Sequence, residues 1–503
     1  MPPADRLLRR PRAALLALAA IVAFAFQGSR GLYETTEGRY AESALEMLQR
    51  GEYLEPTLAG RPHWTKPPLA YWAIAAGVAV AGPNAWGARL SGAVVSCATV
   101  LVVAALGGLL WGGATGLVAG LVYLSSPFPA AAASVVSTDA LLALWEILAV
   151  LLYVRARGEA EPARARRLVR AMWVVWGLAF LTKGPPGLLP LLALAAFARL
   201  SPSRARLLEP VGLAAFVIVG LSWYAWVAVR HPGLLSYFLR DEVVGRVASN
   251  EFKRNPQWYK PFAIYLPVLL LGQGAWLAAG GRLFARLGLT SPRAVWARIR
   301  GGGTGALLLL WLLLPLGVLW ISSSRLPLYV LPLYAPIALA VARGVVLAAG
   351  EAAPRRALAV ALPSALVIVL LKAGAAYAAP SAGKDMLPLA RAVAREAGRD
   401  PAVLVYGGER LYGLQFYLGG ALRRVSASGE EPWADGRLDD AAEEMAACRA
   451  GTFAVVAPRR AGAEVEAALA GAGVAHRRVA VEERELFVAP CAPAAAASAG
   501  GEP

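Results

Sequence analysis

Charged side chains gather in the segment that follows the first apolar stretch of the chain. Glu34 and Glu37 lie three residues apart, Arg39 follows them, and Lys66 stands before two prolines. Arginine suits a phosphate as a planar fork of donors, and lysine suits it as a point charge. A carboxylate suits removal of a proton from an incoming hydroxyl or amine. The segment therefore indicates chemistry on a phosphate-bearing molecule or, as the alternative, cations that bind lipid headgroups.

Two more acids belong to a single apolar stretch further along. Asp139 stands at its start and Glu146 lies seven residues deeper, which places both on roughly one face of a helix. An ionisable group at that depth is costly and therefore a functional candidate, although a buried pair with an arginine would also explain it. For Asp139 the alternative is a helix cap.

Lys183 and Tyr329 are the remaining candidates from spacing. Lys183 lies between two short apolar runs, in Leu181-Thr-Lys-Gly-Pro-Pro186, and its alternative role is to extend harmlessly to the interface. Tyr329 lies in a polar-to-apolar transition after Ser322, and its alternative role is that of an interfacial aromatic.

Composition gives the class of protein that carries these residues. Of 503 residues, 58% are hydrophobic and 17% charged, and the mean hydropathy is +0.52. These values exclude a disordered chain and an ordinary soluble enzyme and indicate a helical membrane protein. The net charge of +17 is concentrated in short loops between apolar runs, so it predicts orientation in a membrane and no binding of nucleic acid.

Apolar runs predict about eleven spans, because a span needs roughly 20 residues to cross the hydrocarbon. The predicted spans are 10–28, 89–110, 113–131, 138–154, 170–182, 185–199, 208–229, 261–282, 304–321, 328–348 and 357–378. The stretch 69–82 is also apolar but short, and we expect an interfacial or re-entrant helix there. The pair of spans around 182–186 is short as well and predicts a broken element.

Basic loops orient these spans. The loops 155–170, 201–206, 282–300 and 350–356 fall on the same side as the basic N-terminus when eleven spans are counted. We therefore expect a multi-pass membrane protein with its N-terminus cytoplasmic and its C-terminus outside. The polar candidates then meet on the outer face, with the external loop 31–68 carrying the site.

The hydrophobic density ends near residue 380, so the predicted domains are a membrane domain over 1–380 and a small α/β domain over 381–490. Helical spacing in 387–397 and 439–449 alternates with β-prone runs at 402–406, 452–457 and 485–489. The last residues, 491–503, are rich in Ala, Gly and Ser and are predicted to be disordered.

Cysteine and histidine contribute little to the candidate site. Cys448 and Cys491 belong to the exported part on this topology, and the sequence leaves open whether they pair. The three histidines have no ligand spacing, so no metal site is predicted, although a site made of carboxylates is not excluded. No cofactor is indicated, and a divalent metal is left open as the alternative.

Several segments together resemble a known family. They are Glu37-Gly-Arg-Tyr-Ala-Glu42, Gly51-Glu-Tyr-Leu-Glu-Pro56, Lys66-Pro-Pro-Leu-Ala-Tyr-Trp72, Thr138-Asp139, Leu181-Thr-Lys-Gly184, Glu242 with Arg246, and Leu326-Pro-Leu-Tyr-Val-Leu-Pro332. In order and spacing they are similar to membrane glycosyltransferases of the GT-C type, specifically lipid A aminoarabinose transferases and protein mannosyltransferase-like enzymes. The resemblance covers about residues 1–350.

The resemblance implies transfer of a sugar from a polyprenyl-phosphate donor to a cell-envelope acceptor, which is a glycolipid of the lipid A type, another glycan or a protein. By position, Arg39, Lys66, Arg246 and Tyr329 contact the donor phosphate, with Lys183 added from the spacing argument. Asp139 supports the site. The resemblance also implies a location in a bacterial inner membrane. A monomer is expected.

One departure affects the expected catalytic base. Where the family has an acidic pair, this chain has Thr36 and Glu37, and threonine is no base at neutral pH. Glu37 is the predicted base, with Glu34 as the substitute. Thr65 and Val243 also replace family residues, which argues against assigning the aminoarabinose reaction itself. The rival functions are a transporter or flippase of lipid-linked sugars, which paired broken helices would favour, and a non-catalytic binder of the same molecules.

Overall fold

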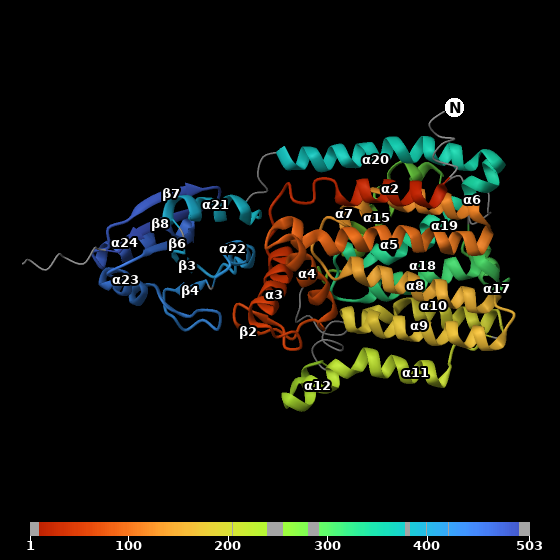
Figure 1. Cartoon of the computed structure of the whole chain (residues 1–503), viewed down its shortest axis with the longest axis horizontal. Helices are drawn as coiled ribbons and strands as arrows, with labels where there is room; N and C mark the ends of the chain where they lie inside the picture. Colours follow the sequence, from red (N-terminus) through yellow and green to blue (C-terminus); the bar gives the residue numbers. More distant parts are fainter. Residues whose placement is uncertain are drawn as a thin grey trace, which may run out of the picture.

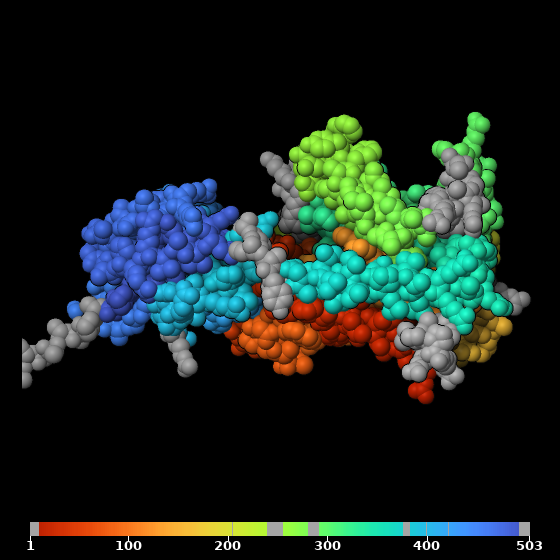
Figure 2. Space-filling model, turned by 90° about the horizontal axis from the view of Figure 1, so that it is seen from above, coloured from red at the N-terminus to blue at the C-terminus, as the bar shows by residue number. Residues whose placement is uncertain are grey.

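The protein is described here from a computed structural model, which covers residues 10–203, 205–238, 255–279, 291–377, 383–398, 400–420 and 422–491. Long helices run side by side in one part, and a smaller part built around a sheet lies at one end of them (Figure 1). Seen at right angles, the smaller part forms a separate lobe (Figure 2). The predicted mainly helical membrane protein with a C-terminal α/β domain is confirmed.

Apolar helices build the larger part. In chain order they are α2 (Pro11–Phe24), α5 (Ala85–Trp111), α6 (Gly113–Leu124), α7 (Pro127–Ala132), α8 (Asp139–Gly158), α9 (Pro162–Lys183), η1 (Pro185–Leu188), α10 (Leu189–Leu200), α11 (Pro210–Phe216), η2 (Val217–Leu221), α12 (Ser222–Arg230), α13 (Leu234–Tyr237), α15 (Lys260–Leu271), η4 (Gly274–Trp276), α17 (Pro292–Arg300), α18 (Gly303–Ile321), η5 (Pro327–Leu333), α19 (Tyr334–Ala349), η6 (Gly350–Ala352) and α20 (Ala353–Tyr377). A continuous core of buried apolar side chains joins most of them.

Four helical stretches within the described part of the chain are long and apolar enough to cross a membrane. They are Ala85–Trp111, Pro210–Arg230, Gly303–Ile321 and Pro327–Ala375. Shorter apolar helices accompany them, among them α2, α6 and α15. Several apolar spans are therefore present, packed side by side as a bundle (Figure 1).

The predicted basic loop 155–170 is mostly helical. Helix α8 continues to Gly158, and α9 begins at Pro162, so 159–161 alone connect them. Arginine is a good helix former, which lets both helices extend past their apolar stretches, and proline suits the first turn of a helix. The predicted short span 170–182 is accordingly the second half of a 22-residue helix.

The segment between α2 and α5, called the external segment after its predicted location, contains helix α3 (Thr36–Arg50), the short strands β1 (Thr57–Leu58) and β2 (Arg61–Pro62), and helix α4 (Leu69–Ala81). Gly51 ends α3 in the left-handed conformation, at φ 66°, which favours glycine. Helix α4 has 13 residues and packs against α3 and α5. Its length matches the predicted interfacial helix better than a full span.

The sheet domain contains α21 (Met386–Ala397), β3 (Ala402–Tyr406), α22 (Tyr412–Leu418), β4 (Arg423–Ser426), β5 (Gly436–Arg437), α23 (Leu438–Ala447), β6 (Thr452–Pro458), η7 (Arg459–Ala461), α24 (Gly462–Gly471), β7 (Arg477–Val481) and β8 (Arg484–Pro490). Its six strands lie in the order β5-β4-β3-β6-β8-β7. Strands β5, β4, β3 and β6 are mutually parallel, whereas β8 is antiparallel to both of its neighbours.

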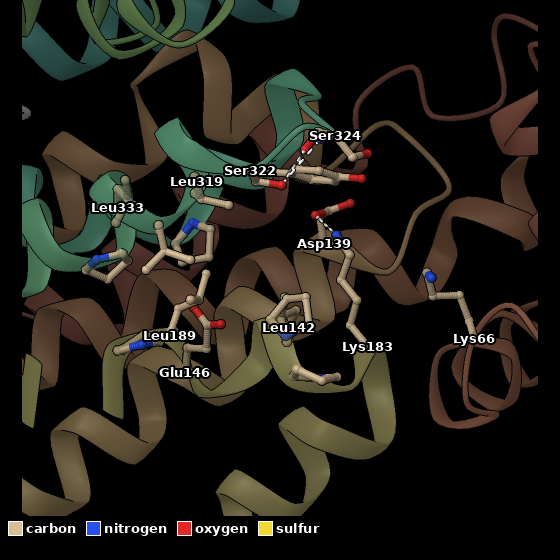
Figure 3. A pocket seen from close by; sticks show the side chains of 17 residues that line it. Lys66, Asp139, Leu142, Glu146, Lys183, Leu189, Leu319, Ser322, Ser324 and Leu333 are labelled. Atoms are coloured by element: carbon tan, nitrogen blue, oxygen red, sulfur yellow. Dashed lines mark hydrogen bonds and ion pairs between the residues drawn. The ribbon is translucent and has the colours of Figure 1, made fainter. Parts of the chain in front are cut away.

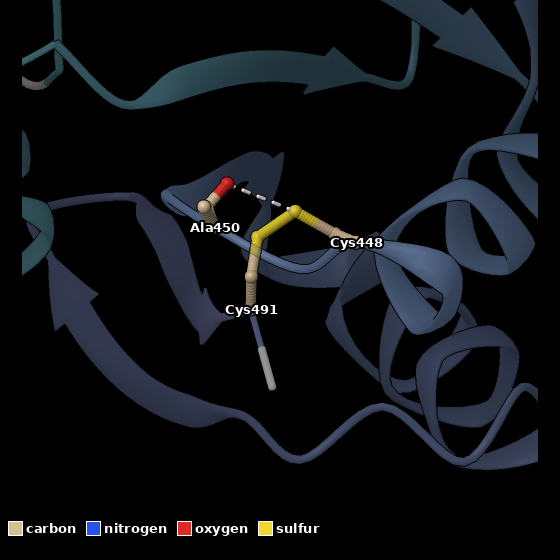
Figure 4. Close-up of a disulfide and its surroundings, with 3 residues drawn as sticks. All are labelled: Cys448, Ala450 and Cys491. Carbon is tan, nitrogen blue, oxygen red and sulfur yellow. Dashed lines mark hydrogen bonds between the residues drawn. A yellow bond between two sulfur atoms is a disulfide. The ribbon is translucent and has the colours of Figure 1, made fainter. Parts of the chain in front are cut away.

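Successive side chains of the central strands point to opposite faces of the sheet, so each face has its own apolar core. Val403 and Val405 of β3 face α21 and α22, while Leu404 and Tyr406 face α23 and α24. The sheet is thereby covered by helices on both faces. Cys448 and Cys491, whose pairing the sequence left open, form a disulfide that joins the end of α23 to the end of β8 (Figure 4).

The sheet domain is fixed to the external segment by its backbone. The N–H of Glu34 donates to the carbonyl of Lys384 at 2.9 Å, and the N–H of Met386 donates to the carbonyl of Leu32 at 3.1 Å. Helices α3 and α22 pack so closely that a Cβ on Gly38 would lie 2.4 Å from the backbone nitrogen of Gly413. Only glycine permits this approach.

Candidate functional site

A cavity of about 190 Å³ lies among the ends of α8, α9, α10, α18 and η5 that face the sheet domain. Its walls are mostly leucine, valine and proline. Its polar lining consists of Lys66, Asp139, Glu146, Lys183, Ser322, Ser324 and Tyr329. Four of the predicted site residues therefore meet in one space, although they come from four separate segments (Figure 3).

Asp139 and Lys183 form an ion pair at this cavity. Helix α8 begins at Asp139 and α9 ends at Lys183, and the two helices pack together, which brings the side chains into contact. Both side chains are at most 10% exposed. Asp139 therefore binds Lys183 and is not merely a helix cap. Lys183, in turn, does not extend to the membrane interface.

Tyr329 completes this group. The ammonium of Lys183 lies 4.4 Å from the centre of the Tyr329 ring, within the range of a cation–π contact. Tyr329 belongs to η5, which packs against α8. Its ring is thus directed to the cavity, whereas the ring of an interfacial aromatic residue would be directed to the lipid.

Lys66 enters the cavity from the external segment. Its side chain is buried, and its ammonium donates to the carbonyl of Thr65 at 2.6 Å. Arg39 is not among the lining residues of the cavity. Its guanidinium lies 5.1 Å from the Tyr40 ring, and its Nε is buried without a hydrogen-bond partner in the described part of the chain. The predicted phosphate contact Arg246 lies outside the described residues.

Glu37 is no accessible base in this structure. Its carboxylate accepts from Arg30 at 2.5 Å, from Arg89 at 3.0 Å, and from the backbone N–H groups of Tyr33 and Val136 at 3.0 Å. Burial alone would raise the pKa of Glu37, but the charges of Arg89 and Arg30 outweigh it and lower the pKa to about 2. A carboxylate so saturated with donors is a poor proton acceptor. These contacts give Glu37 a structural role, and its assignment as the base stays a prediction.

Glu34 faces the sheet domain. Its carboxylate accepts from the backbone N–H of Gly413 and does not line the cavity. Burial raises the pKa of Glu34 to about 7, although the Gly413 hydrogen bond counteracts it. Its proton affinity suits a base near neutral pH, but its direction does not suit chemistry in the cavity.

The partner of Glu37 was missed in the sequence analysis. Arg89 is 1% exposed, lies near the start of α5, and also donates to the carbonyls of Gln27, Arg30 and Gly31. An arginine at the edge of an apolar span was the available signal, because such a residue nearly always has an acidic or carbonyl partner. The described residues contain no group of three or more metal-ligating side chains.

Residues 65–227 match the family of dolichyl-phosphate-mannose-protein mannosyltransferases. The undecaprenyl phosphate-alpha-4-amino-4-deoxy-L-arabinose arabinosyl transferase of Pseudomonas savastanoi is 31% identical over 342 residues, which cover 66% of this chain and 61% of that protein. The enzyme of the same name from Yersinia enterocolitica is 31% identical over 345 residues, which cover 67% of this chain and 60% of that protein. The chain thus spans about three fifths of the length of these curated relatives.

Solved structures identify the fold. ArnT from Cupriavidus metallidurans, bound to undecaprenyl phosphate, superposes with a TM-score of 0.76 at 19% identity, over 97% of this chain and 99% of that one. The fold is that of ArnT. An Archaeoglobus fulgidus oligosaccharyltransferase is similar at a TM-score of 0.54 and 14% identity, over 95% of this chain and 73% of that one. The resemblance to GT-C membrane glycosyltransferases that the motifs predicted is confirmed.

Proposed function

We propose that this protein is an integral-membrane glycosyltransferase that moves a sugar from a polyprenyl-phosphate donor to a cell-envelope acceptor. The observation that carries the proposal is one cavity that is lined by Lys66, the Asp139–Lys183 pair and Tyr329 and otherwise mostly by apolar side chains. Cations at one end suit a phosphate, and apolar walls suit the first units of a prenyl chain. The fold shared with ArnT, whose structure holds undecaprenyl phosphate, supports this assignment.

The proposed chemistry is stabilisation of the leaving phosphate. Lys66, Lys183 and Tyr329 are placed to contact the phosphate as negative charge develops on it, and Arg39 adds to this field from the external segment. Arg246 is proposed as a further phosphate contact from the resemblance alone. Donors fixed in advance in a site that excludes water are the largest common source of catalysis. Asp139 acts by fixing Lys183. No base is assigned, because neither Glu34 nor Glu37 lines the cavity.

The proposed acceptor is a lipid A-type glycolipid, in line with the names of the curated relatives, with another glycan or a protein as the alternatives. The proposed orientation in a bacterial inner membrane has the N-terminus in the cytoplasm and the sheet domain outside. The basic ends of α8, α9 and α17 lie at the end of the bundle away from the sheet domain (Figure 1), in agreement with the positive-inside rule.

Eleven spans and three regions complete the proposal. The spans follow the apolar runs of the sequence, with α4 kept outside the count. The regions are a membrane domain over 1–380, an extracytoplasmic domain over 381–490 and a tail over 491–503. The Cys448–Cys491 disulfide supports the external position of the sheet domain, because disulfides persist in oxidising compartments.

Removal of a phosphate contact tests the function. We expect Lys66→Ala and Arg39→Ala to lower transfer from a polyprenyl-phosphate sugar to an envelope extract by at least roughly 100-fold, because each loses a positive charge that stabilises the charge developing on the phosphate in the transition state. Transfer is measured with membranes that contain equal amounts of each variant. The matched control is Arg50→Ala, which removes an exposed arginine at the other end of the helix that carries Arg39.

The same assay separates the rival functions. Full transfer by both variants would overturn the phosphate assignment. Movement of the donor across a sealed vesicle without any transfer would identify a transporter or flippase. Tight binding of the donor with neither movement nor transfer would identify a non-catalytic binder.

A further inference from the structure

A second cavity lies toward the end of the bundle away from the sheet domain, and the proposed chemistry does not use it. Its volume is about 1120 Å³, and its walls come mainly from α15, α17, α18 and α19 (Figure 1). Cavities that bind small ligands usually measure about 300–1,000 Å³. The second cavity therefore has room for more than a small polar molecule.

Most of the lining of the second cavity is apolar. Leucine is its most frequent residue, and two of these leucines, Leu270 and Leu347, are 42% and 57% exposed. In a membrane-spanning bundle, apolar side chains that neighbouring helices leave uncovered face the hydrocarbon of the bilayer. The second cavity is therefore open sideways to lipid, and its walls suit a hydrocarbon chain.

Both charged residues of this lining are arginines. Arg298 lies on α17, and its Nε is 2.7 Å from the position that a Cβ on Gly305 would take, so its side chain packs against the first turn of α18. Arg343 lies on α19, with its guanidinium 5.8 Å from the centre of the Trp111 ring. Neither arginine has a hydrogen bond or an ion pair with any residue that the structure describes. Two positive charges thus line the second cavity without a counter-charge.

The position of these charges along the bundle identifies a leaflet. Thr304, in the first turn of α18, lines the second cavity, and Ser322, directly after α18, lines the cavity of the candidate site. The helix between them corresponds to roughly 27 Å, close to the thickness of the hydrocarbon layer of about 30 Å. The two cavities therefore lie toward opposite surfaces of the membrane. In the proposed orientation the second one belongs to the cytoplasmic leaflet.

The proposed sugar donor does not satisfy this cavity. Its phosphate is placed at Lys66, at the other end of the bundle, and its prenyl chain carries no charge for Arg298 or Arg343. A water-soluble phosphate would satisfy the arginines but leave the apolar walls without a partner. The occupant that matches both features has an anionic headgroup and hydrocarbon chains.

We infer that the second cavity binds an anionic phospholipid of the cytoplasmic leaflet, with its headgroup at Arg298 and Arg343 and an acyl chain along the leucines. Arginine binds phosphate oxygens through two parallel hydrogen bonds, and basic pockets between membrane helices on the cytoplasmic side are typical sites for anionic headgroups. Gly302 and Gly303 line the same end of the cavity and leave the backbone N–H groups at the start of α18 accessible as further donors. The inference goes beyond the proposed function, and only the choice of leaflet rests on the proposed orientation.

Lipid binding to the purified full chain tests the inference. Native mass spectrometry in detergent gives the Kd of phosphatidylglycerol, which is anionic, and of phosphatidylethanolamine with the same acyl chains, which has no net charge. We expect the wild type to bind one phosphatidylglycerol at least about tenfold more tightly than phosphatidylethanolamine. Arg298→Gln combined with Arg343→Gln should raise the Kd of phosphatidylglycerol roughly 10- to 100-fold and that of phosphatidylethanolamine less than about threefold, because only the anionic headgroup loses a counter-charge.

Two further variants separate this cavity from the basic end of the bundle in general. Arg293→Gln combined with Arg300→Gln removes two exposed arginines of α17 that do not line the cavity, and it should leave both Kd values unchanged. Leu312→Trp reduces the space for the acyl chain and keeps both arginines, so it should weaken the binding of both lipids to a similar extent. Equal effects of the two double variants, equal affinity of the wild type for the two lipids, or unchanged binding in Leu312→Trp would overturn the inference.

Competition separates the phospholipid from the other phosphate-bearing ligands. A polyprenyl phosphate added to the wild type loaded with phosphatidylglycerol should not release it, because the two lipids occupy different cavities. Release by the polyprenyl phosphate, or by inorganic phosphate alone, would overturn the inference. If the polyprenyl phosphate does not bind at all, the proposed function fails, whereas selective binding of phosphatidylglycerol still supports the inference.

Discussion

At the scale of single residues, the acids of the external segment and those of the cavity have separate tasks. Glu37 is enclosed by Arg30 and Arg89, whereas Asp139 and Glu146 line the cavity. Glu37 thereby joins the start of α3 to the start of α5 and to the segment before α8, through the N–H of Val136. A carboxylate that connects three segments is a determinant of the fold, and its removal should be measurable as a loss of stability.

Glu37→Gln should lower the free energy of unfolding by about 3–5 kcal/mol, because Arg89 would stay buried without a counter-charge. The measurement is thermal or denaturant unfolding of the purified protein in detergent. Glu444→Gln is the matched control, since its partner Arg423 forms an exposed pair whose loss should cost at most about 1 kcal/mol.

The pH dependence of stability is a second way to measure the contribution of the Glu37 carboxylate. The folded-state pKa of Glu37, about 2, is below the ordinary value of 4.5. Its contribution to stability is therefore fully present above pH 4.5 and is lost as the pH falls through 2. Wild type should lose stability in this window more steeply than Glu37→Gln. Unchanged stability in the variant together with loss of transfer would restore Glu37 as the base.

The residue types of the candidate site could be predicted from the sequence, but their grouping could not. Lys66, Asp139, Lys183 and Tyr329 were singled out one by one, and the structure unites them in one cavity. The ion pair of Glu37 could not be predicted, because the spacing of neighbours in the chain carries no sign of Arg89, which lies 52 residues away. A long-range ion pair depends on how helices pack, and one sequence does not reveal that packing.

At the scale of elements, helix α3 is the connection between the two parts of the molecule. It packs on α4 on one side and on α22 of the sheet domain on the other. Two acids at this contact have raised proton affinity. Burial raises the pKa of Glu34 to about 7, and burial together with the neighbouring Glu46 raises the pKa of Glu42 to about 9. The contact between α3 and α22 should therefore respond to pH.

Glu34→Gln should flatten this response between pH 4.5 and 7. The folded-state pKa of Glu34 is above its ordinary value of 4.5, so its contribution to stability is present below pH 4.5 and is lost as the pH rises through 7. Thermal unfolding at pH 5 to 8 measures the effect. Wild type should become less stable across this range relative to the variant. Parallel curves for the two proteins would contradict the assignment.

Long apolar elements were easier to predict than short strands. The predicted strands at 402–406, 452–457 and 485–489 correspond to β3, β6 and β8, whose apolar runs are buried. Strand β4, whose four residues begin with Arg423 and Arg424, was missed. Strands β5 and β7 were missed as well. They lie at the two edges of the sheet, where β5 has two residues and β7 begins with exposed Arg477 and Arg478. Charged edge strands prevent pairing between molecules, and they lack the apolar signal of a buried strand.

At the scale of the whole molecule, the sheet domain and the basic helix ends lie at opposite ends of the bundle (Figure 1). The proposed orientation therefore places Cys448 and Cys491 in an oxidising compartment. Cys97 is buried among apolar helices and is not part of the disulfide. The state of the Cys448–Cys491 pair thus reports on orientation, and the burial of Cys97 reports on the packing of the helices.

Thiol labelling should distinguish the two kinds of cysteine. In unfolded protein isolated without reductant, we expect one thiol to react with a maleimide, and after reduction we expect three. Mass spectrometry counts the labels. Replacing both Cys448 and Cys491 with serine should lower the stability of the sheet domain by about 2–5 kcal/mol. Three reactive thiols before reduction would place the domain on the reducing side of the membrane.

The backbone contact between Gly38 and Gly413 limits how the protein can admit its substrates. At this point no side chain separates the two helices, and around it the side chains of Tyr40, Ala44 and Leu45 pack in one apolar cluster with Phe416. We therefore expect the sheet domain to keep its position on α3 during turnover. Substrates would then reach the cavity between the helices or around the edge of the sheet domain.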